Sequence, residues 1–197
     1  MVEPSVEEHP ALLVMDVQRG IVERFGGDPA LLDRIGTALA AARSAAIPVI
    51  YVVVRFRAGY PEISQRNRAF SASRQAGRAL AEGDPAAEIH PAIAPRPGDI
   101  VVTKRRVSAF AGSDLEVVLR AGGIDGLVLS GIATSGVVLS TLRYAADMDY
   151  RLSVLADCCA DGDPEVQRVL LEKVFPRQAT VLTAAEWRAA IAKSPKS

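Results

Sequence analysis

Six short apolar runs, separated by stretches with helix signals, constrain the fold of this chain more than any other feature. The runs are rich in Val, Leu and Ile and cover residues 11–16, 48–54, 99–104, 126–131, 151–157 and 179–183. None alternates polar with apolar residues, which is typical of strands buried on both faces of a parallel sheet. The pattern therefore predicts an α/β fold: a three-layer, doubly wound, six-stranded parallel sheet in the common strand order 3-2-1-4-5-6.

Capping residues between these runs mark where helices begin. An Asp-Pro pair at 28–29 opens a helix that ends near Ala46, and a second pair at 163–164 opens another. Two capping boxes pair residues three positions apart, Ser113 with Glu116 and Thr183 with Glu186. The sequence thus places a helix between most pairs of strands.

The segment 55–98 interrupts the alternation, because it is too long for a simple connection. We expect a helix between about 64 and 81 and then a proline-rich loop, and such segments often form lids or interfaces. No linker or internal repeat divides the 197 residues. The predicted organisation is an N-terminal arm (1–10) and one domain (11–193).

Composition excludes several classes of partner. Lys and Arg together number 23, as do Asp and Glu, so no overall charge favours nucleic acid or an anionic membrane. No segment has the ~20 apolar residues of a membrane span, and the acidic N-terminus has no signal-peptide pattern. The adjacent Cys158 and Cys159 are interpreted as reduced, buried thiols, which favours the cytoplasm. Because His9 and His90 fit no ligand spacing, we expect no metal and no other cofactor.

The expected strand order creates a crevice beyond the carboxyl ends of the first and fourth strands, where the winding reverses. Asp16 ends the first run, Lys104 ends the third, and residues 132–136 follow the fourth. We expect these groups to share the crevice, although a turn residue or helix cap (Asp16) and a solvated turn (Lys104) are the structural alternatives. Burial would raise the pKa of Asp16 and a nearby cation would lower it, so the sequence leaves open whether Asp16 is an acid or a base.

The segment after the fourth run, 131-GIATSGVVLST-141, combines a tight turn with a helix start. Backbone N–H groups at that start would offer a site for an anion or an oxyanion. Its glycines have the spacing of a phosphate loop, but Val137 and Val138 stand where Lys and Ser or Thr would be needed. An NTPase is therefore excluded, and no G-x-G-x-x-G follows any run to indicate a dinucleotide site.

Three motifs, in this order, resemble those of the isochorismatase-like hydrolases. They are 14-VMDVQRG-20, 102-VTKRRVSAF-110 and 131-GIATSGVVLST-141, and the resemblance spans about residues 10–183. It implies the six-stranded parallel sheet of that superfamily, which includes nicotinamidases, N-carbamoylsarcosine amidases and isochorismatases. It also implies an oligomer, a homodimer or a homotetramer.

The same resemblance implies roles for individual residues. Asp16 and Lys104 would be catalytic, and the peptide bond between Ile132 and Ala133 would be cis. The oxyanion donors would be the N–H groups of Ala133 and Val137. Two further residues of the motifs, Gln18 and Thr134, are candidate contacts to the substrate.

Val137 is the main departure from the family pattern. The amidase members read G-x-x-T-x-x-C, and valine stands here in place of the nucleophilic cysteine. Since valine cannot attack a carbonyl, covalent thioester chemistry is excluded at this position, and Cys158 and Cys159 lie at the end of the fifth run. Isochorismatases also lack the cysteine, and the resemblance implies that their carboxylic acid protonates a vinyl ether before water adds and pyruvate leaves. They usually carry glycine at this position, so we expect a narrower pocket here.

A basic segment follows the second run. Residues 55–78 hold six arginines and a single acidic residue, Glu62. Capture of an anionic substrate is one interpretation, with Arg55 as the best candidate because it follows the strand. A solvated helix face or an oligomer interface is the alternative. Phe25, Phe110 and Tyr60 are candidates for pocket walls, or for simple core residues.

Three hypotheses for function remain open. The first is a cofactor-free hydrolase of a small carboxylated, isochorismate-like substrate, acting through Asp16 and Lys104. The second is a non-catalytic binding or scaffold protein that kept the fold without the thiol. The third is an amide or ester hydrolase in which Asp16 activates water as a general base.

Overall fold

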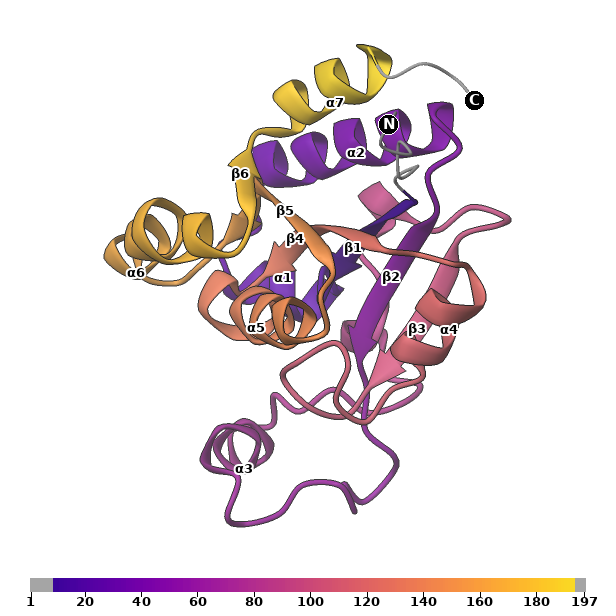
Figure 1. Cartoon of the computed structure of the whole chain (residues 1–197). Coiled ribbons are helices and arrows are strands. Elements are labelled where there is room, and N and C mark those ends of the chain that lie inside the picture. The colour runs from indigo at the N-terminus through magenta and orange to yellow at the C-terminus, as the bar shows by residue number, and fades with distance from the viewer. Residues whose placement is uncertain (1–8, 194–197) are drawn as a thin grey trace.

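The computed structural model describes residues 9–193 and contains one six-stranded sheet. Its strands are β1 (Pro10–Met15), β2 (Val49–Val54), β3 (Ile100–Lys104), β4 (Gly126–Ile132), β5 (Arg151–Ala160) and β6 (Thr180–Leu182). They lie in the order β3-β2-β1-β4-β5-β6 and every neighbouring pair is parallel (Figure 1). The predicted fold class and strand order are confirmed.

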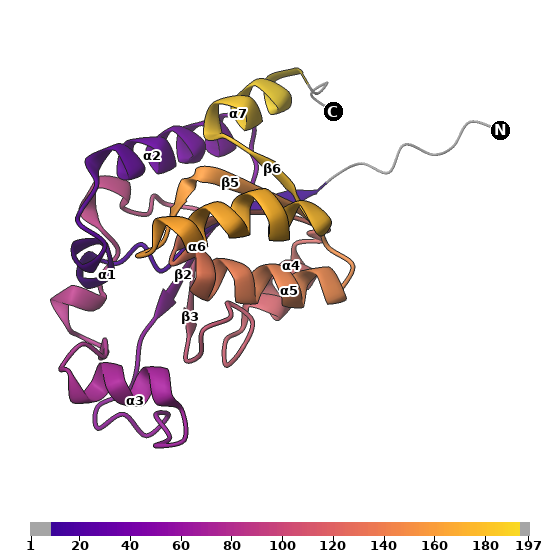
Figure 2. The same ribbon diagram turned by 90° about the vertical axis from the view of Figure 1, so that its left-hand side faces the viewer.

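Helices cover both faces of this sheet. They are α1 (Arg19–Arg24), α2 (Pro29–Ser44), α3 (Arg68–Gln75), α4 (Leu115–Ala121), α5 (Leu139–Asp147), α6 (Pro164–Val169) and α7 (Ala184–Lys193). Helices α2 and α7 lie together on one face, and α4 and α5 lie on the other (Figures 1 and 2). The predicted N-terminal arm falls outside the described residues except for His9 and Pro10, and Pro10 already belongs to β1.

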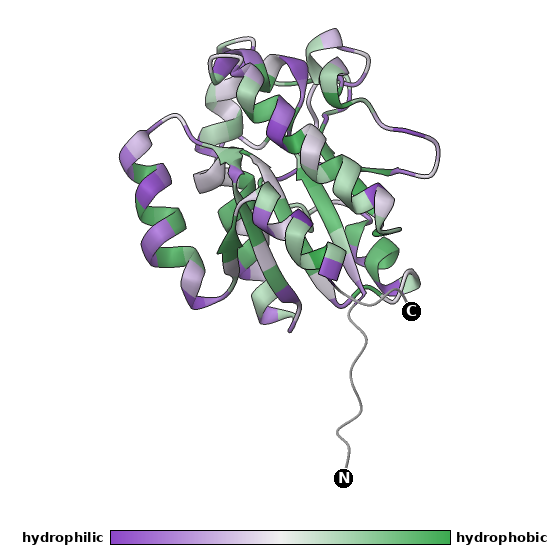
Figure 3. Cartoon of the chain, turned by 90° about the horizontal axis from the view of Figure 1, so that it is seen from above, coloured by the Kyte–Doolittle hydropathy of each residue, from purple (hydrophilic) through white to green (hydrophobic). Residues whose placement is uncertain are grey.

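Side-chain alternation along the strands feeds two separate hydrophobic cores. In β1, Leu12 and Val14 pack with α2 and with Trp187 of α7, whereas Leu13 and Met15 pack with α4 and α5. All four residues are at most 1% exposed, as both faces of the sheet are covered. Figure 3 shows the hydrophobic strands between helices of mixed hydropathy. Within residues 9–193, no helix is long and apolar enough to cross a membrane.

Most of the predicted helix starts are confirmed. Asp28 accepts the N–H of Ala30, and Asp163 accepts the N–H groups of Glu165 and Val166. Thr183 and Glu186 form the reciprocal pair of a capping box, in which each side chain accepts the other residue's N–H.

The capping box predicted at Ser113 and Glu116 is wrong. Helix α4 begins at Leu115, so Glu116 lies one position too early in the first turn to reach back to Ser113. Ser113 Oγ instead donates to the carbonyl of Ala109 (2.6 Å), and Glu116 binds Arg120. Ser113 is therefore held by its bond to Ala109, in the turn that precedes α4.

The long connection between β2 and β3, residues 55–99, is called the excursion below. The helix predicted between about 64 and 81 is wrong in extent, because α3 covers only Arg68–Gln75. Asn67 caps its start, and Gly77, at a φ of 63°, turns the chain soon after its end. Helix α3 has no buried residue and stands apart from the two helical layers (Figures 1 and 2).

Candidate active site

Asp16 is the first residue beyond β1, at the point where the sheet reverses its winding. Its N–H donates to the carbonyl of Val52 (2.8 Å), which extends the parallel pairing with β2 by one bond. Its φ of 57° lies in the left-handed region that Asp tolerates better than most residues. The strand thus ends in a turn, and Asp16 is only 6% exposed there.

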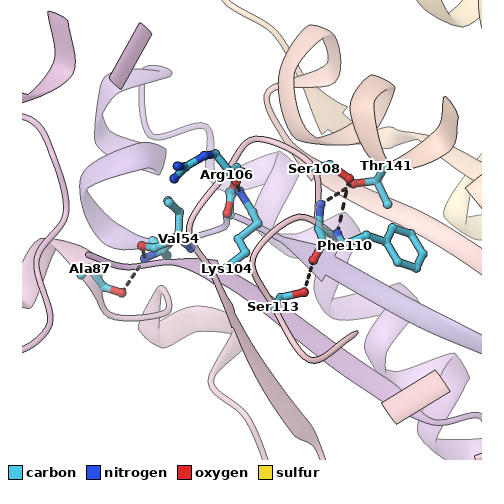
Figure 4. A network of polar contacts seen from close by, with 11 residues as sticks. Val54, Ala87, Lys104, Arg106, Ser108, Phe110, Ser113 and Thr141 are labelled. Atoms are coloured by element: carbon cyan, nitrogen blue, oxygen red, sulfur yellow. Dashed lines mark hydrogen bonds and ion pairs between the residues drawn. The ribbon is translucent and has the colours of Figure 1, made fainter. Parts of the chain in front are cut away.

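Lys104 ends β3, two strands away from β1, and its side chain is 1% exposed. Its Nζ reaches across the end of β2 to Asp16 Oδ2 at 2.8 Å. Nζ also donates to the carbonyl of Arg106 (2.9 Å), so the loop after β3 folds back over the ammonium group (Figure 4). That loop is tied to α5, because Thr141 Oγ1 accepts the N–H of Ala109 (3.0 Å). Asp16 and Lys104 therefore form one buried ion pair.

The second carboxylate oxygen of Asp16, Oδ1, is buried and has no hydrogen-bond partner among residues 9–193. Burial raises the pKa of Asp16, and the adjacent Lys104 lowers it by charge and hydrogen bonding. The balance raises the pKa above its usual value. Asp16 thus holds a proton more readily than an exposed carboxyl does.

The turn after β4 completes the site. Gly131 has a φ of 144°, and a Cβ there would lie 2.2 Å from the carbonyl oxygen of Met15, so only glycine fits. The Ile132–Ala133 peptide bond is cis, as the family resemblance implied. A π-helical turn, η3 (Thr134–Val138), then leads into α5, and Asp161 accepts the N–H of Ser135 (2.7 Å). These bonds place residues 133–137 beside Asp16.

A pocket of about 210 Å³ opens over the Asp16–Lys104 pair. The sheet side of the pocket is formed by residues at strand ends and in η3: Asp16, Val54, Lys104, Ala133, Gly136 and Val137. The other side comes from α1 and the excursion, chiefly Arg24, Phe56, Phe70, Ser73, Arg78 and Leu80. Val137, which stands where the motif resemblance implies a cysteine nucleophile, thus lines the same pocket as Asp16.

Two predicted substrate contacts are engaged elsewhere. Gln18 is fully buried, and its amide binds the N–H and the carbonyl of Val54 and the carbonyl of Ala87. Arg55 pairs with Glu88 at 3.0 Å. Neither Gln18 nor Arg55 lines the pocket, so the structure gives both a role in holding the excursion against the sheet.

Phe25 and Phe110, which were predicted to wall the pocket, and Thr134, a predicted substrate contact, also lie outside it. Phe110 stacks on Tyr144 with ring centroids 4.6 Å apart, and Phe25 packs against the core on the α2 side. Thr134 is fully buried, and its Oγ1 has no partner in the described part of the chain. Core packing, the alternative considered for the aromatic residues, fits both Phe25 and Phe110.

The sequence did not single out several pocket residues. Arg24 lies in the last turn of α1, where no pattern distinguishes it from a surface arginine. Phe56 and Phe70 meet edge to face at 5.2 Å, although they are 14 positions apart in the chain. Arg78 belongs to the basic segment, but only the path of the excursion shows that it, and not Arg55, reaches the pocket.

The cysteines lie away from this chemistry. Cys158 and Cys159 are buried in β5, and neither lines the pocket. Burial raises the pKa of both thiols, that of Cys159 to about 12, which keeps them protonated and unreactive. In the part of the chain that the structure describes, no group of three or more His, Cys, Asp or Glu residues could hold a metal ion.

Comparison with known proteins agrees with the fold. The Isochorismatase domain family matches residues 10–186. The chain belongs to the isochorismatase family. Among curated members, ureidoacrylate amidohydrolase RutB of Azorhizobium caulinodans is 32% identical over 95% of this chain and 92% of its own length. The isochorismatase family protein YecD of Escherichia coli O157:H7 is 34% identical over 89% of this chain and 93% of its own.

Solved structures of isochorismatase-family proteins superpose over nearly the whole chain. A cysteine hydrolase from Pseudomonas syringae pv. phaseolicola has a TM-score of 0.84 at 27% identity and covers 98% of this chain and 99% of its own. N-carbamoylsarcosine amidase from Thermoplasma acidophilum has a TM-score of 0.71 at 28% identity, covering 89% and 96%. This isochorismatase-family chain therefore shares its architecture with hydrolases, and it carries Val137 where the motif resemblance implies a cysteine nucleophile.

Proposed function

We propose that this chain is a cofactor-free hydrolase of a small carboxylated substrate that works by proton transfer through Asp16. One observation carries the proposal: Asp16 lines the pocket together with Val137, and its buried carboxyl oxygen Oδ1 has no hydrogen-bond partner in residues 9–193. Proton transfer needs a positioned acid with a raised pKa, and it needs no thiol.

Hydrolysis of a vinyl ether, as in isochorismatases, suits these groups best. Protonated Asp16 gives its proton to the terminal vinyl carbon, whose electron pair forms the new C–H bond and leaves an oxocarbenium ion. Water adds to that ion and gives a proton back to the Asp16 carboxylate, and the neutral hemiketal breaks down to a ketone and an alcohol. Lys104 holds the carboxyl group in place and stabilises the carboxylate that remains after the transfer.

Amide hydrolysis is the second candidate, because several relatives are named ureidoacrylate amidohydrolases. Here ionised Asp16 takes a proton from water, and the water oxygen attacks the carbonyl. The N–H groups of Ala133 and Val137, in residues that line the pocket, are the proposed oxyanion donors. The direction of proton transfer at Asp16 distinguishes the two candidates.

The test compares wild type with an Asp16→Asn variant, using Asp33→Asn on the exposed face of α2 as a matched control. The substrates are isochorismate, ureidoacrylate and nicotinamide, and release of product is measured. We expect turnover of isochorismate, unchanged in the control and at least about 100-fold lower in Asp16→Asn.

If only ureidoacrylate is turned over, and Asp16→Asn abolishes that turnover, amide hydrolysis would replace vinyl ether hydrolysis as the proposed reaction. No turnover of any of the three substrates would contradict catalysis and support a binding or scaffold protein. A cytoplasmic location and a homodimer or homotetramer stay predictions from the sequence.

A further inference from the structure

The pocket is lined by more positively charged than negatively charged side chains. Four charged side chains line it, namely Asp16, Lys104, Arg24 and Arg78. Asp16 forms an ion pair with Lys104 and offsets one of the three positive charges. Two guanidinium charges remain, in a protein whose Lys and Arg equal its Asp and Glu. The pocket therefore favours an anion more than the molecule as a whole does.

Arg24 is held by its own helix and leaves its outer nitrogens free. Its Nε donates to the carbonyl of Gly20 at 2.7 Å, which fixes the side chain along α1. Within residues 9–193, Arg24 has no carboxylate at ion-pair distance. Arg24 and Arg78 line the same pocket, and burial and the charge of Arg78 both lower the pKa of Arg24.

Arg78 reaches the pocket from the other side, from the chain that follows α3. Its side chain makes no ion pair or hydrogen bond within the described residues. Two other arginines of the excursion are neutralised by acids: Arg55 binds Glu88, and Arg57 binds Glu62. Arg78 thus differs from them both in its place and in its lack of a counter-ion.

The two arginines converge because α1 and the excursion are locked together beneath them. A Cβ on Gly20 would lie 2.9 Å from the Cβ of Ala86, so glycine allows α1 to pack directly on the excursion. One residue further along the excursion, the carbonyl of Ala87 accepts a bond from the buried amide of Gln18 (2.6 Å). These two contacts hold the segment that carries Arg24 against the excursion, to which Arg78 belongs.

We propose that Arg24 and Arg78 together bind the carboxylate of the substrate at the mouth of the pocket, opposite the Asp16–Lys104 pair. Guanidinium groups match carboxylates with paired hydrogen bonds, and an anion between them relieves their mutual repulsion. The inference rests on the proposed function, since it names the group by which that site recognises its substrate. The pocket would then bind compounds that have a carboxylate at one end and an uncharged hydrolysable group at the other. It would bind neutral amides less tightly.

The test measures binding, so that it does not depend on turnover. The monoamide of fumaric acid carries one carboxylate, and fumaramide has an uncharged amide in its place with the same number of heavy atoms. Calorimetric titration of wild type, Arg24→Gln and Arg78→Gln is compared with Arg66→Gln, an exposed arginine of the excursion outside the pocket.

We expect the monoamide to bind wild type about 10-fold tighter than fumaramide, and to lose that advantage in Arg24→Gln and in Arg78→Gln. Arg66→Gln should bind as wild type does, and the melting temperature of each variant shows that it is folded. Equal affinity for the two ligands, binding of neither, or an advantage that survives both pocket substitutions would overturn the inference. Arginine-dependent binding without turnover of any substrate would instead refute the proposed hydrolase and leave the carboxylate site standing.

Discussion

The two sides of the pocket are built in different ways. The sheet side rests on strand ends, where Asp16 and Lys104 are buried and form an ion pair through Asp16 Oδ2. The excursion side rests on an irregular connection whose helix, α3, buries no residue. Rigid elements hold groups that must keep an accurate geometry, while connections vary more easily. Under the proposed function, the sheet side carries out proton transfer and the excursion selects the substrate.

The largest effect that this comparison predicts is at Gly131. Gly131→Ala would place a Cβ 2.2 Å from the carbonyl oxygen of Met15 at a φ that alanine disfavours. We expect the free energy of unfolding to fall by more than about 4 kcal/mol, or the protein not to fold. Gly136→Ala is the matched control, because its Cβ would meet only Ala133, at 3.7 Å, and should change stability by less than about 1 kcal/mol. Urea denaturation measures both, and similar losses would contradict the prediction.

The next largest difference is in unfolding free energy, between a variant that breaks an ion pair on the sheet side and one that breaks an ion pair in the excursion. Lys104→Met leaves Asp16 buried without its cation, which should cost about 3–5 kcal/mol of unfolding free energy. Arg57→Met removes a side chain that is 65% exposed and pairs with Glu62 in the excursion, which should cost at most about 1 kcal/mol. Equal losses in denaturant titrations would show that the two pairs are buried alike.

The sequence predicted the sheet side of the site far better than the excursion side. Asp16 and Lys104 could be placed because each ends an apolar run, and the order of strands brings those ends together. Gln18 and Arg55 could not be assigned in the same way, since their partners are the backbone of Val54 and Ala87 and the side chain of Glu88. Such polar bonds depend on the path of an irregular segment, which no periodicity encodes.

The same lesson separates the arginines. Six of them lie between residues 55 and 78, and composition alone treats them alike. In the folded chain the excursion packs against α1, for example at Gly20 and Ala86, and Arg78 lines the same pocket as Arg24, a residue from outside the basic segment. Long-range contact therefore decides which charges belong to the site.

The pKa values of Asp16 on the sheet side and Glu62 in the excursion should be shifted in opposite directions from their ordinary values. Burial raises the pKa of Asp16 above its ordinary 3.8; for Glu62, hydrogen bonds from the backbone and Arg57 outweigh burial and hold the pKa below 4.5. Because folded Asp16 binds its proton more tightly, its contribution makes stability fall as pH rises from 3.8 through the raised pKa. Glu62 contributes stability above pH 4.5, and that contribution is lost as pH falls through its lowered pKa.

Carboxyl carbon NMR, assigned with Asp16→Asn and Glu62→Gln, measures both pKa values. Because the proposed donor must carry its proton, turnover of the vinyl ether should also decrease as pH rises through the raised pKa of Asp16. Turnover that increases over that range would make Asp16 a base and favour the amide. A pKa for Asp16 below that of Glu62 would contradict the structural comparison itself.

The smallest expected effect concerns the aromatic contact that holds α3 to the start of the excursion. Phe56 is 1% exposed beside the end of β2, and Phe70 reaches it from α3 with ring centroids 5.2 Å apart. Since α3 buries no residue, it can open locally while the sheet stays folded. Phe70→Leu should therefore lower the global free energy of unfolding by less than about 1 kcal/mol and mainly speed hydrogen exchange in residues 68–75. Phe56→Leu, the matched change at the buried end of the same contact, should lower the global value more, because it leaves a gap among fully packed residues. If instead Phe70→Leu speeds exchange equally in β1 and β4, then α3 unfolds only with the sheet, and the excursion is as rigid a support for substrate binding as the strand ends are for Asp16.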